Sequence, residues 1–130
     1  MDQDNYRYLS VKNQSGEVVP PYAVMRIVET DKEDTIYISK PNKDNDKLIM
    51  LNGPSQIGID GTGLGTIDMP FWAAFNQADG TPGNGEQWGT ENGSWKLKKD
   101  KRGFLTIAMK GGSSPPIAGI VLVKFEECIP

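Results

Sequence analysis

Short apolar runs separated by turn-forming residues constrain this chain more than any other feature of its sequence. The segment 70–109 shows this best, because it holds all three tryptophans and three of the four phenylalanines, divided by closely spaced glycines. Glycine and proline mark sharp changes of chain direction, and apolar runs this short are typical of strands rather than helices. The pattern therefore predicts an all-β protein.

The same pattern extends along the rest of the chain. Residues 22–29 (YAVMRIVE) and 35–39 (TIYIS) flank a charged reversal and predict a hairpin. Residues 47–51 (KLIML) predict a buried strand, and residues 118–125 (AGIVLVKF) predict the last and most apolar strand. Because turn signals recur about every ten residues, we expect an antiparallel β-sandwich or barrel with about eight to ten short strands.

Alternation along these strands also predicts the core. The inward-facing positions are expected to be Trp72, Trp95, Phe104, Ile107 and the run 120–123. The segment 76–93 is the longest irregular stretch, and loops of that length are usually functional or disordered. Trp88 lies within it and is expected to be the most exposed tryptophan. An exposed aromatic side chain marks a protein interface or a ligand site.

The length of the chain favours one domain. With 130 residues, we expect residues 1–130 to form a single β domain with a short polar N-terminal arm of about residues 1–10. The acidic first residues lack the basic and apolar regions of a secretory signal. Tyr6 and Tyr8 either belong to an arm that pairs with a neighbour's sheet edge, or begin the domain's own first strand at residues 6–11.

Charge and composition exclude several classes of function. The formal net charge of −3 argues against non-specific binding to nucleic acid or to anionic membranes, which requires a basic surface. No apolar run approaches the length of about 20 residues that crosses a bilayer. The chain has no histidine, which removes the commonest general base and metal ligand. We therefore expect no enzymatic activity, no cofactor and no metal.

Three local patterns resemble functional motifs without completing them. The glycines of residues 61–65 (GTGLG) resemble a phosphate-binding loop, but Pro70 blocks the helix that such a loop needs, so a plain turn is favoured. Asn42, Asp44 and Asp46 have the first spacings of a calcium loop but lack its glycine and its final glutamate. The carboxylates Asp68, Glu86 and Glu91 would need a specific separation to act in glycoside hydrolysis. A solvated surface is the simpler interpretation of both sets of polar residues.

One cluster of basic residues stands out, formed by Lys96, Lys98, Lys99, Lys101 and Arg102. Alternation with Trp95 and Leu97 explains the first two lysines as the solvent-facing side of a strand. The alternative is contact with an acidic surface on a partner. Charge runs are usually solvated faces, so the first interpretation is favoured.

Two blocks together carry a resemblance: residues 13–28 (NQSGEVVPPYAVMRIV) and 85–107 (GEQWGTENGSWKLKKDKRGFLTI). The pairing resembles small proteins encoded among the structural genes of tailed bacteriophages. It is similar to β-rich virion components such as capsid decoration (cement) proteins and head-fibre or tail-fibre modules. The residues that carry it are turn and core residues, so it transfers no defined functional site.

The resemblance implies a structural role in a virion. The expected function is a decoration protein on the outer capsid surface, with the major capsid protein as partner and with self-association, a trimer being favoured. The alternative is a carbohydrate-binding or structural module of a head or tail fibre, with Trp88 contacting the glycan. The candidate contact residues are Tyr6, Tyr8, Trp88, Lys99 and Arg102.

Overall fold

The structure is a computed structural model that describes residues 7–111 and 113–126. The described chain is nearly all β, as the sequence predicts, with ten strands and one short 3-10 helix, η2. In chain order the elements are β1 (Leu9–Asn13), β2 (Val24–Thr30), β3 (Ile36–Ser39), β4 (Ile49–Asn52), β5 (Thr62–Thr66), β6 (Phe71–Ala74), η2 (Gln77–Asp79), β7 (Gln87–Gly89), β8 (Lys98–Lys99), β9 (Gly103–Ile107) and β10 (Ile120–Phe125).

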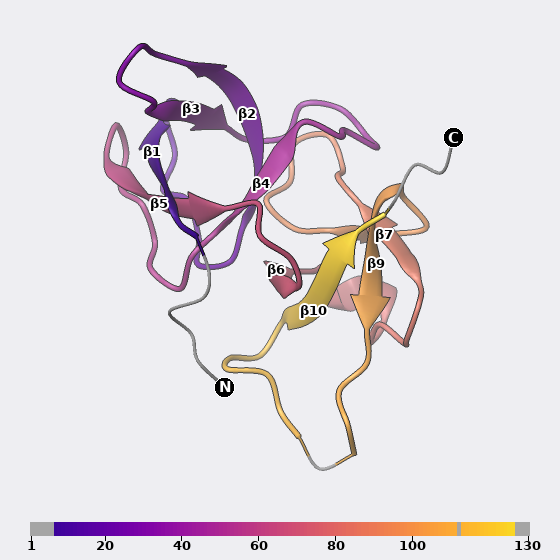
Figure 1. Ribbon diagram of the computed structural model, residues 1–130. Helices are drawn as coiled ribbons and strands as arrows, with labels where there is room; N and C mark the ends of the chain where they lie inside the picture. The colour runs from indigo at the N-terminus through magenta and orange to yellow at the C-terminus, as the bar shows by residue number, and fades with distance from the viewer. Residues whose placement is uncertain (1–6, 112, 127–130) are drawn as a thin grey trace.

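The first five strands close into a barrel, in the order β1-β3-β2-β4-β5 (Figure 1). The predicted hairpin is present, because β2 and β3 pair antiparallel. One pair differs from the antiparallel prediction: β1 runs parallel to β3, with Val11 opposite Ile36. The alternation of side chains is the same in parallel and antiparallel strands, so the sequence pattern does not reveal the direction of pairing.

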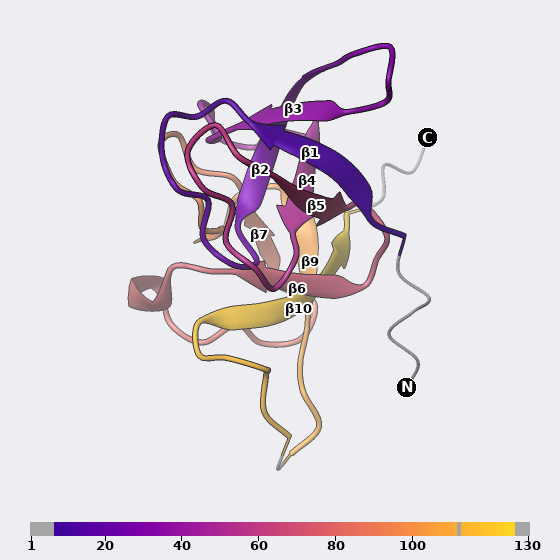
Figure 2. The same ribbon diagram turned by 90° about the vertical axis from the view of Figure 1, so that its left-hand side faces the viewer.

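The other five strands form a second sheet in the order β6-β10-β9-β7-β8, with every strand pair antiparallel. This sheet lies beside the barrel, as the two perpendicular views show (Figures 1 and 2). A parallel bridge between Phe75 and Leu97 links residues that follow β6 to residues that precede β8. The second sheet is therefore curled, and its two edge strands lie close to each other.

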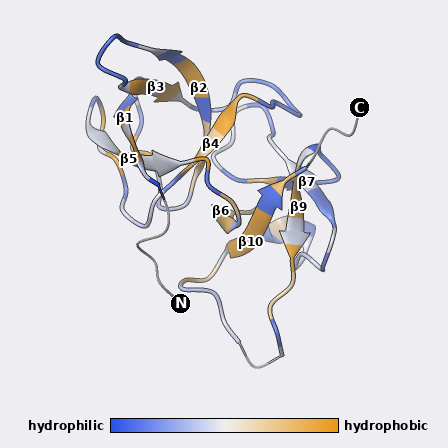
Figure 3. Ribbon diagram, viewed as in Figure 1, coloured by the Kyte–Doolittle hydropathy of each residue, from blue (hydrophilic) through white to orange (hydrophobic). Residues whose placement is uncertain are grey.

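Strands β2 and β4 belong to both halves of the protein. Met25 on β2 and Met50 on β4 point into the barrel, where they meet Val11, Ile38 and Trp95. Their neighbours Val24 and Leu51 point the other way, into a second core with Phe71, Trp88, Phe104 and Val123. All four residues of β4 are buried, which confirms the buried strand predicted from the continuous apolar run. Figure 3 shows the apolar strand β4 in orange between the rest of the barrel and the second sheet.

The glycines of residues 61–65 serve packing inside the barrel. They lie largely on strand β5, so the expectation of a plain turn is wrong for this segment. A side chain at Gly65 would begin 2.8 Å from the methyl carbon of Met50 and 2.9 Å from that of Met25. A side chain at Gly63 would begin 2.7 Å from Ile57. The alternating glycines therefore leave room in the barrel for the larger side chains of Met25, Met50 and Ile57.

The core prediction is partly confirmed. Trp95, Phe104 and three residues of the run 120–123 are buried. Trp72, Ile107 and Leu122 are only half-buried, because they lie on the face of the second sheet opposite to Phe71, Thr106 and Val123. Trp72 still packs against the margin of the second core. The expectation that Trp88 is exposed is wrong, since its side chain is 0% exposed.

Residues 7–10, which fall within the predicted polar arm of about residues 1–10, contact the body of the domain. The backbone nitrogen of Arg7 donates to Asp68 at 2.7 Å, and the Arg7 carbonyl accepts from the Thr66 hydroxyl at 2.8 Å. Strand β1 begins at Leu9 and pairs with β5. The described residues of this segment therefore follow the second interpretation, in which the segment belongs to the domain's own first strand. Tyr6 lies outside the described residues.

A close approach of two backbones predicts that position 89 accepts only glycine. A β-carbon at Gly89 would lie 2.0 Å from the carbonyl oxygen of Arg102, far inside van der Waals contact. We expect Gly89→Ala to destabilise the protein by on the order of 3 kcal/mol or more, because backbone atoms have to move. Denaturant unfolding followed by tryptophan fluorescence measures the effect.

Gly58→Ala is the matched control, because a β-carbon there meets no atom within 4 Å. The control should unfold within about 1 kcal/mol of the parent protein. Equal stability of the two variants would contradict the close approach at Gly89.

Candidate functional site

The outer face of the second sheet carries a row of apolar side chains. Leu122 on β10 lies opposite Trp72 on β6 and opposite Ile107 on β9, so the three side chains share one face. All three are half-buried, whereas their neighbours Phe71 and Val123 are buried on the opposite face. This apolar row (Trp72, Leu122 and Ile107) lies on a face that a sheet with one solvated side usually fills with polar residues.

The apolar row continues into a shallow pocket of about 380 Å³, which we call the shelf. Met69 and Pro70 line it from the segment before β6, Ile107 from β9, and Lys124 and Phe125 from the end of β10. The Phe125 ring stacks on the buried Phe104 ring, with a centroid distance of 5.2 Å and an interplanar angle of 22°. The shelf therefore rests on the rigid core of the second sheet.

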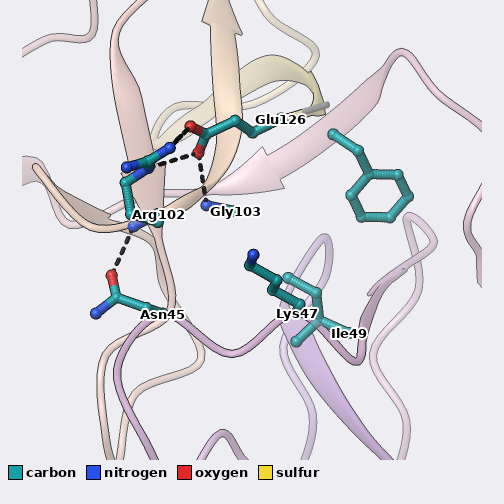
Figure 4. Close-up of a pocket in the computed structure, with 7 residues that line it drawn as sticks. Asn45, Lys47, Ile49, Arg102, Gly103 and Glu126 are labelled. Carbon is teal, nitrogen blue, oxygen red and sulfur yellow. Dashed lines mark hydrogen bonds and ion pairs between the residues drawn. The ribbon is translucent and has the colours of Figure 1, made fainter. Parts of the chain in front are cut away.

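A second pocket of about 460 Å³ lies where the barrel meets the second sheet, and we call it the seam pocket. It is lined by Asn45, Lys47, Ile49, Arg102, Gly103, Phe125 and Glu126. Figure 4 shows Lys47 and Ile49 on one side of it, facing Arg102, Gly103 and Glu126 on the other. Phe125 lines both the seam pocket and the shelf, so the two pockets are neighbours, and we call them together the concave strip.

Glu126 organises the polar end of this strip. Its carboxylate accepts hydrogen bonds from Arg102 Nε at 3.0 and 2.8 Å, from the Gly103 nitrogen at 3.1 Å and from Gln87 Nε2 at 3.2 Å. The backbone nitrogen of Arg102 in turn donates to Asn45 Oδ1 at 2.7 Å. The hydrogen bonds from Arg102 are the largest influence and hold the pKa of Glu126 below its ordinary value, while burial opposes them.

The predicted basic cluster is largely neutralised within the protein. Lys98 pairs with Asp79 at 3.3 Å, Lys101 pairs with Asp44 at 2.9 Å, and Arg102 pairs with Glu126. Of the two cluster residues predicted to make contacts, Arg102 lines the seam pocket, whereas Lys99 is exposed on the edge strand β8. The structure therefore places Arg102 beside the concave strip.

The predicted aromatic contact residues lie elsewhere. Trp88 is a core residue, because its glycine-rich surroundings fold into β7 in the second sheet. Its ring packs against Phe75 at 5.6 Å, and its Nε1 donates to Glu86 Oε1 at 3.0 Å. That hydrogen bond is the largest influence lowering the pKa of Glu86. Tyr8 is 37% exposed and meets Phe71 edge to face at 6.2 Å.

The acidic residues that resemble a calcium loop are occupied by the protein itself. Asp44 accepts from the Asn92 nitrogen at 2.9 Å in addition to its ion pair, and Asp46 accepts from the Leu48 nitrogen at 3.1 Å. Within residues 7–111 and 113–126, no group of three or more acidic, cysteine or histidine side chains is placed to hold a metal ion. The described chain also has no helix that could span a bilayer. No family model, curated protein or solved structure matches the chain.

The ion pair at the seam pocket predicts a pH-dependent contribution to stability. A carboxyl whose folded pKa is depressed stabilises the fold above its unfolded pKa, and this contribution is lost as the pH falls through the folded pKa. We therefore expect Glu126→Gln to lower the melting temperature at neutral pH. The difference from the parent protein should close below pH about 4, the ordinary range of glutamate.

The control for this prediction is Glu33→Gln, which removes one carboxylate from the exposed β2–β3 loop. Thermal melts of the three proteins across the acid range measure the effect. A melting-temperature difference for Glu126→Gln that stays constant with pH would contradict a stabilising ionised Glu126.

Proposed function

We propose that this protein is a structural component of a tailed-phage virion that decorates the outer capsid surface and stabilises the shell through protein–protein contacts. The apolar row and the adjoining shelf on the outer face of the second sheet are the observation that carries this proposal. Contiguous exposed apolar surface on a folded domain marks an interaction site. The resemblance of residues 13–28 and 85–107 to virion proteins supports the same role.

The architecture suits a protein that acts through contacts with other proteins and not through catalysis. The barrel is closed and the second sheet is curled, so the contact face rests on a scaffold with two packed cores. The proposed partners are the major capsid protein and further copies of the chain. Identical subunits usually assemble with closed cyclic symmetry, and local threefold positions on an icosahedral shell would favour a trimer.

The rival function, a glycan-binding fibre module, is the weaker candidate. It rests on Trp88 as an exposed stacking platform, and Trp88 is 0% exposed. Replacement of this tryptophan would therefore disturb the core before it changed any ligand contact. The apolar row carries Trp72, but this tryptophan is joined by two aliphatic neighbours rather than by the polar groups that fix a sugar's orientation.

Imaging of purified virions with this protein labelled tests the proposal. A decoration protein should cover the head in many copies, and virions that lack it should lose resistance to heat, because bound contacts stabilise the shell by mass action. Label confined to the tail would support a fibre or neck component instead. Absence of the protein from virions would overturn the structural role.

A substitution on the apolar row tests whether this face makes the contact. Ile107→Asp places a charge on the outer face of β9, which should leave the fold intact and lower the occupancy of the protein on virions at least about tenfold, because buried unpaired charge in an interface is unfavourable. Quantitative mass spectrometry of purified particles measures the occupancy.

Ile59→Asp is the matched control, since Ile59 is 58% exposed in the loop between β4 and β5, away from the apolar row. This variant should bind virions as the parent protein does. Equal occupancy for both variants would show that the apolar row is not the contact surface.

A further inference from the structure

The chain contains three Asn-Gly pairs: Asn52-Gly53, Asn84-Gly85 and Asn92-Gly93. In this dipeptide the glycine nitrogen can attack the asparagine side-chain carbonyl carbon, because glycine has no side chain to hinder ring closure. A bond forms between that nitrogen and the side-chain carbon, the bond to the amide nitrogen breaks, and ammonia leaves. Water then opens the cyclic imide to aspartate or isoaspartate.

The folded protein holds all three attacking nitrogens in backbone hydrogen bonds. The Gly53 nitrogen donates to Leu64 O at 3.2 Å, the Gly85 nitrogen to Thr106 O at 2.7 Å and the Gly93 nitrogen to Pro41 O at 2.8 Å. Attack requires the nitrogen to give up its proton and to turn toward its own asparagine side chain. Both are opposed while the N–H group is fixed on a distant carbonyl, so folding protects every one of these pairs.

The three asparagines differ in what conversion to aspartate would do. Asn52 is 1% exposed, and its Nδ2 donates to Pro20 O at 2.8 Å and to Ser55 O at 2.9 Å. Aspartate has no N–H to donate, so one of its oxygens would face two carbonyl oxygens. The buried Oδ1 of Asn52 accepts no hydrogen bond from the described residues, and a buried charge without hydrogen bonds is unfavourable.

The other two positions accept the change. Asn84 is exposed, and its Oδ1 accepts a hydrogen bond from the Ala108 nitrogen at 3.0 Å, which an aspartate oxygen can also accept. Asn92 is exposed, so an added carboxylate there stays in water. These two pairs therefore have the same chemistry as Asn52-Gly53 without the same structural consequence.

We propose that Asn52 is a deamidation site that is closed in the folded protein and open in the unfolded chain, and that its conversion makes unfolding irreversible. The reaction consumes one water and releases one ammonia. The product at position 52 lacks the two donated hydrogen bonds that join β4 to the segments at Pro20 and Ser55. A chain that stays unfolded therefore loses the ability to refold, whereas a chain that stays folded keeps Asn52 and can refold after a brief unfolding.

The test uses the full chain, held in guanidinium chloride at mildly alkaline pH with a reductant that keeps Cys128 as a thiol. Samples are refolded by dilution at intervals, and the refolded and unrefolded fractions are separated and digested. Peptides with aspartate and with isoaspartate have the same mass, so they are resolved by chromatography before mass spectrometry. We expect chains with aspartate at position 52 to be depleted at least about tenfold from the refolded fraction, because an uncompensated buried charge is strongly destabilising. Aspartate at positions 84 and 92 should appear equally in both fractions.

The variant Gly53→Ala tests whether loss of refolding is caused by deamidation at Asn52 or by other changes to the unfolded chain. Its β-carbon would lie 3.4 Å from Leu64 O and 3.7 Å from a Tyr8 ring carbon, which are ordinary contacts, so the variant should fold. The added methyl group hinders ring closure at Asn52 alone. This variant should lose its refoldable fraction more slowly than the parent protein.

Three outcomes would overturn the proposal. One is aspartate at position 52 in the refolded fraction at the share found in the whole pool. Another is loss of refolding in Gly53→Ala at the parent rate. The third is conversion of Asn52 in the folded protein, held at the same pH without denaturant, as fast as in the denatured chain.

Discussion

Two strands that bury apolar side chains on both faces, β4 along its whole length and β2 at its start, hold this structure together. Val24 and Leu51 point into the second core while Met25 and Met50 point into the barrel, so β2 and β4 have apolar side chains on both faces. Neither core would be closed without these two strands. The barrel and the second sheet therefore pack against the same two strands.

The sequence predicted the strands well because the alternation of side chains depends only on local backbone geometry. It missed features set by distant residues. Trp88 was expected to be exposed because glycines surround it, yet those glycines bring its backbone against Arg102 and allow burial. The parallel pairing of β1 with β3, and the packing role of Gly63 and Gly65, likewise arise only when the barrel closes.

The candidate site was only partly predictable for a related reason. Arg102 was identified from its charge, and it does line the seam pocket. Trp72 and Ile107 were assigned to the core because both faces of β6, β9 and β10 are apolar, and alternation does not reveal which face a second layer covers. Only the buried positions of Phe71 and Val123 decide that the apolar row lies outside.

Because β2 and β4 contribute to both cores, they also determine how the protein would respond to a mechanical force. A force applied to the outer face of the second sheet would pass through the Val24 and Leu51 side chains into strands whose backbones are hydrogen-bonded within the barrel. The load would then be distributed over the neighbouring strands β3 and β5 as well. A protein attached through its second sheet would thus distribute tension over the barrel as well, rather than over one hairpin.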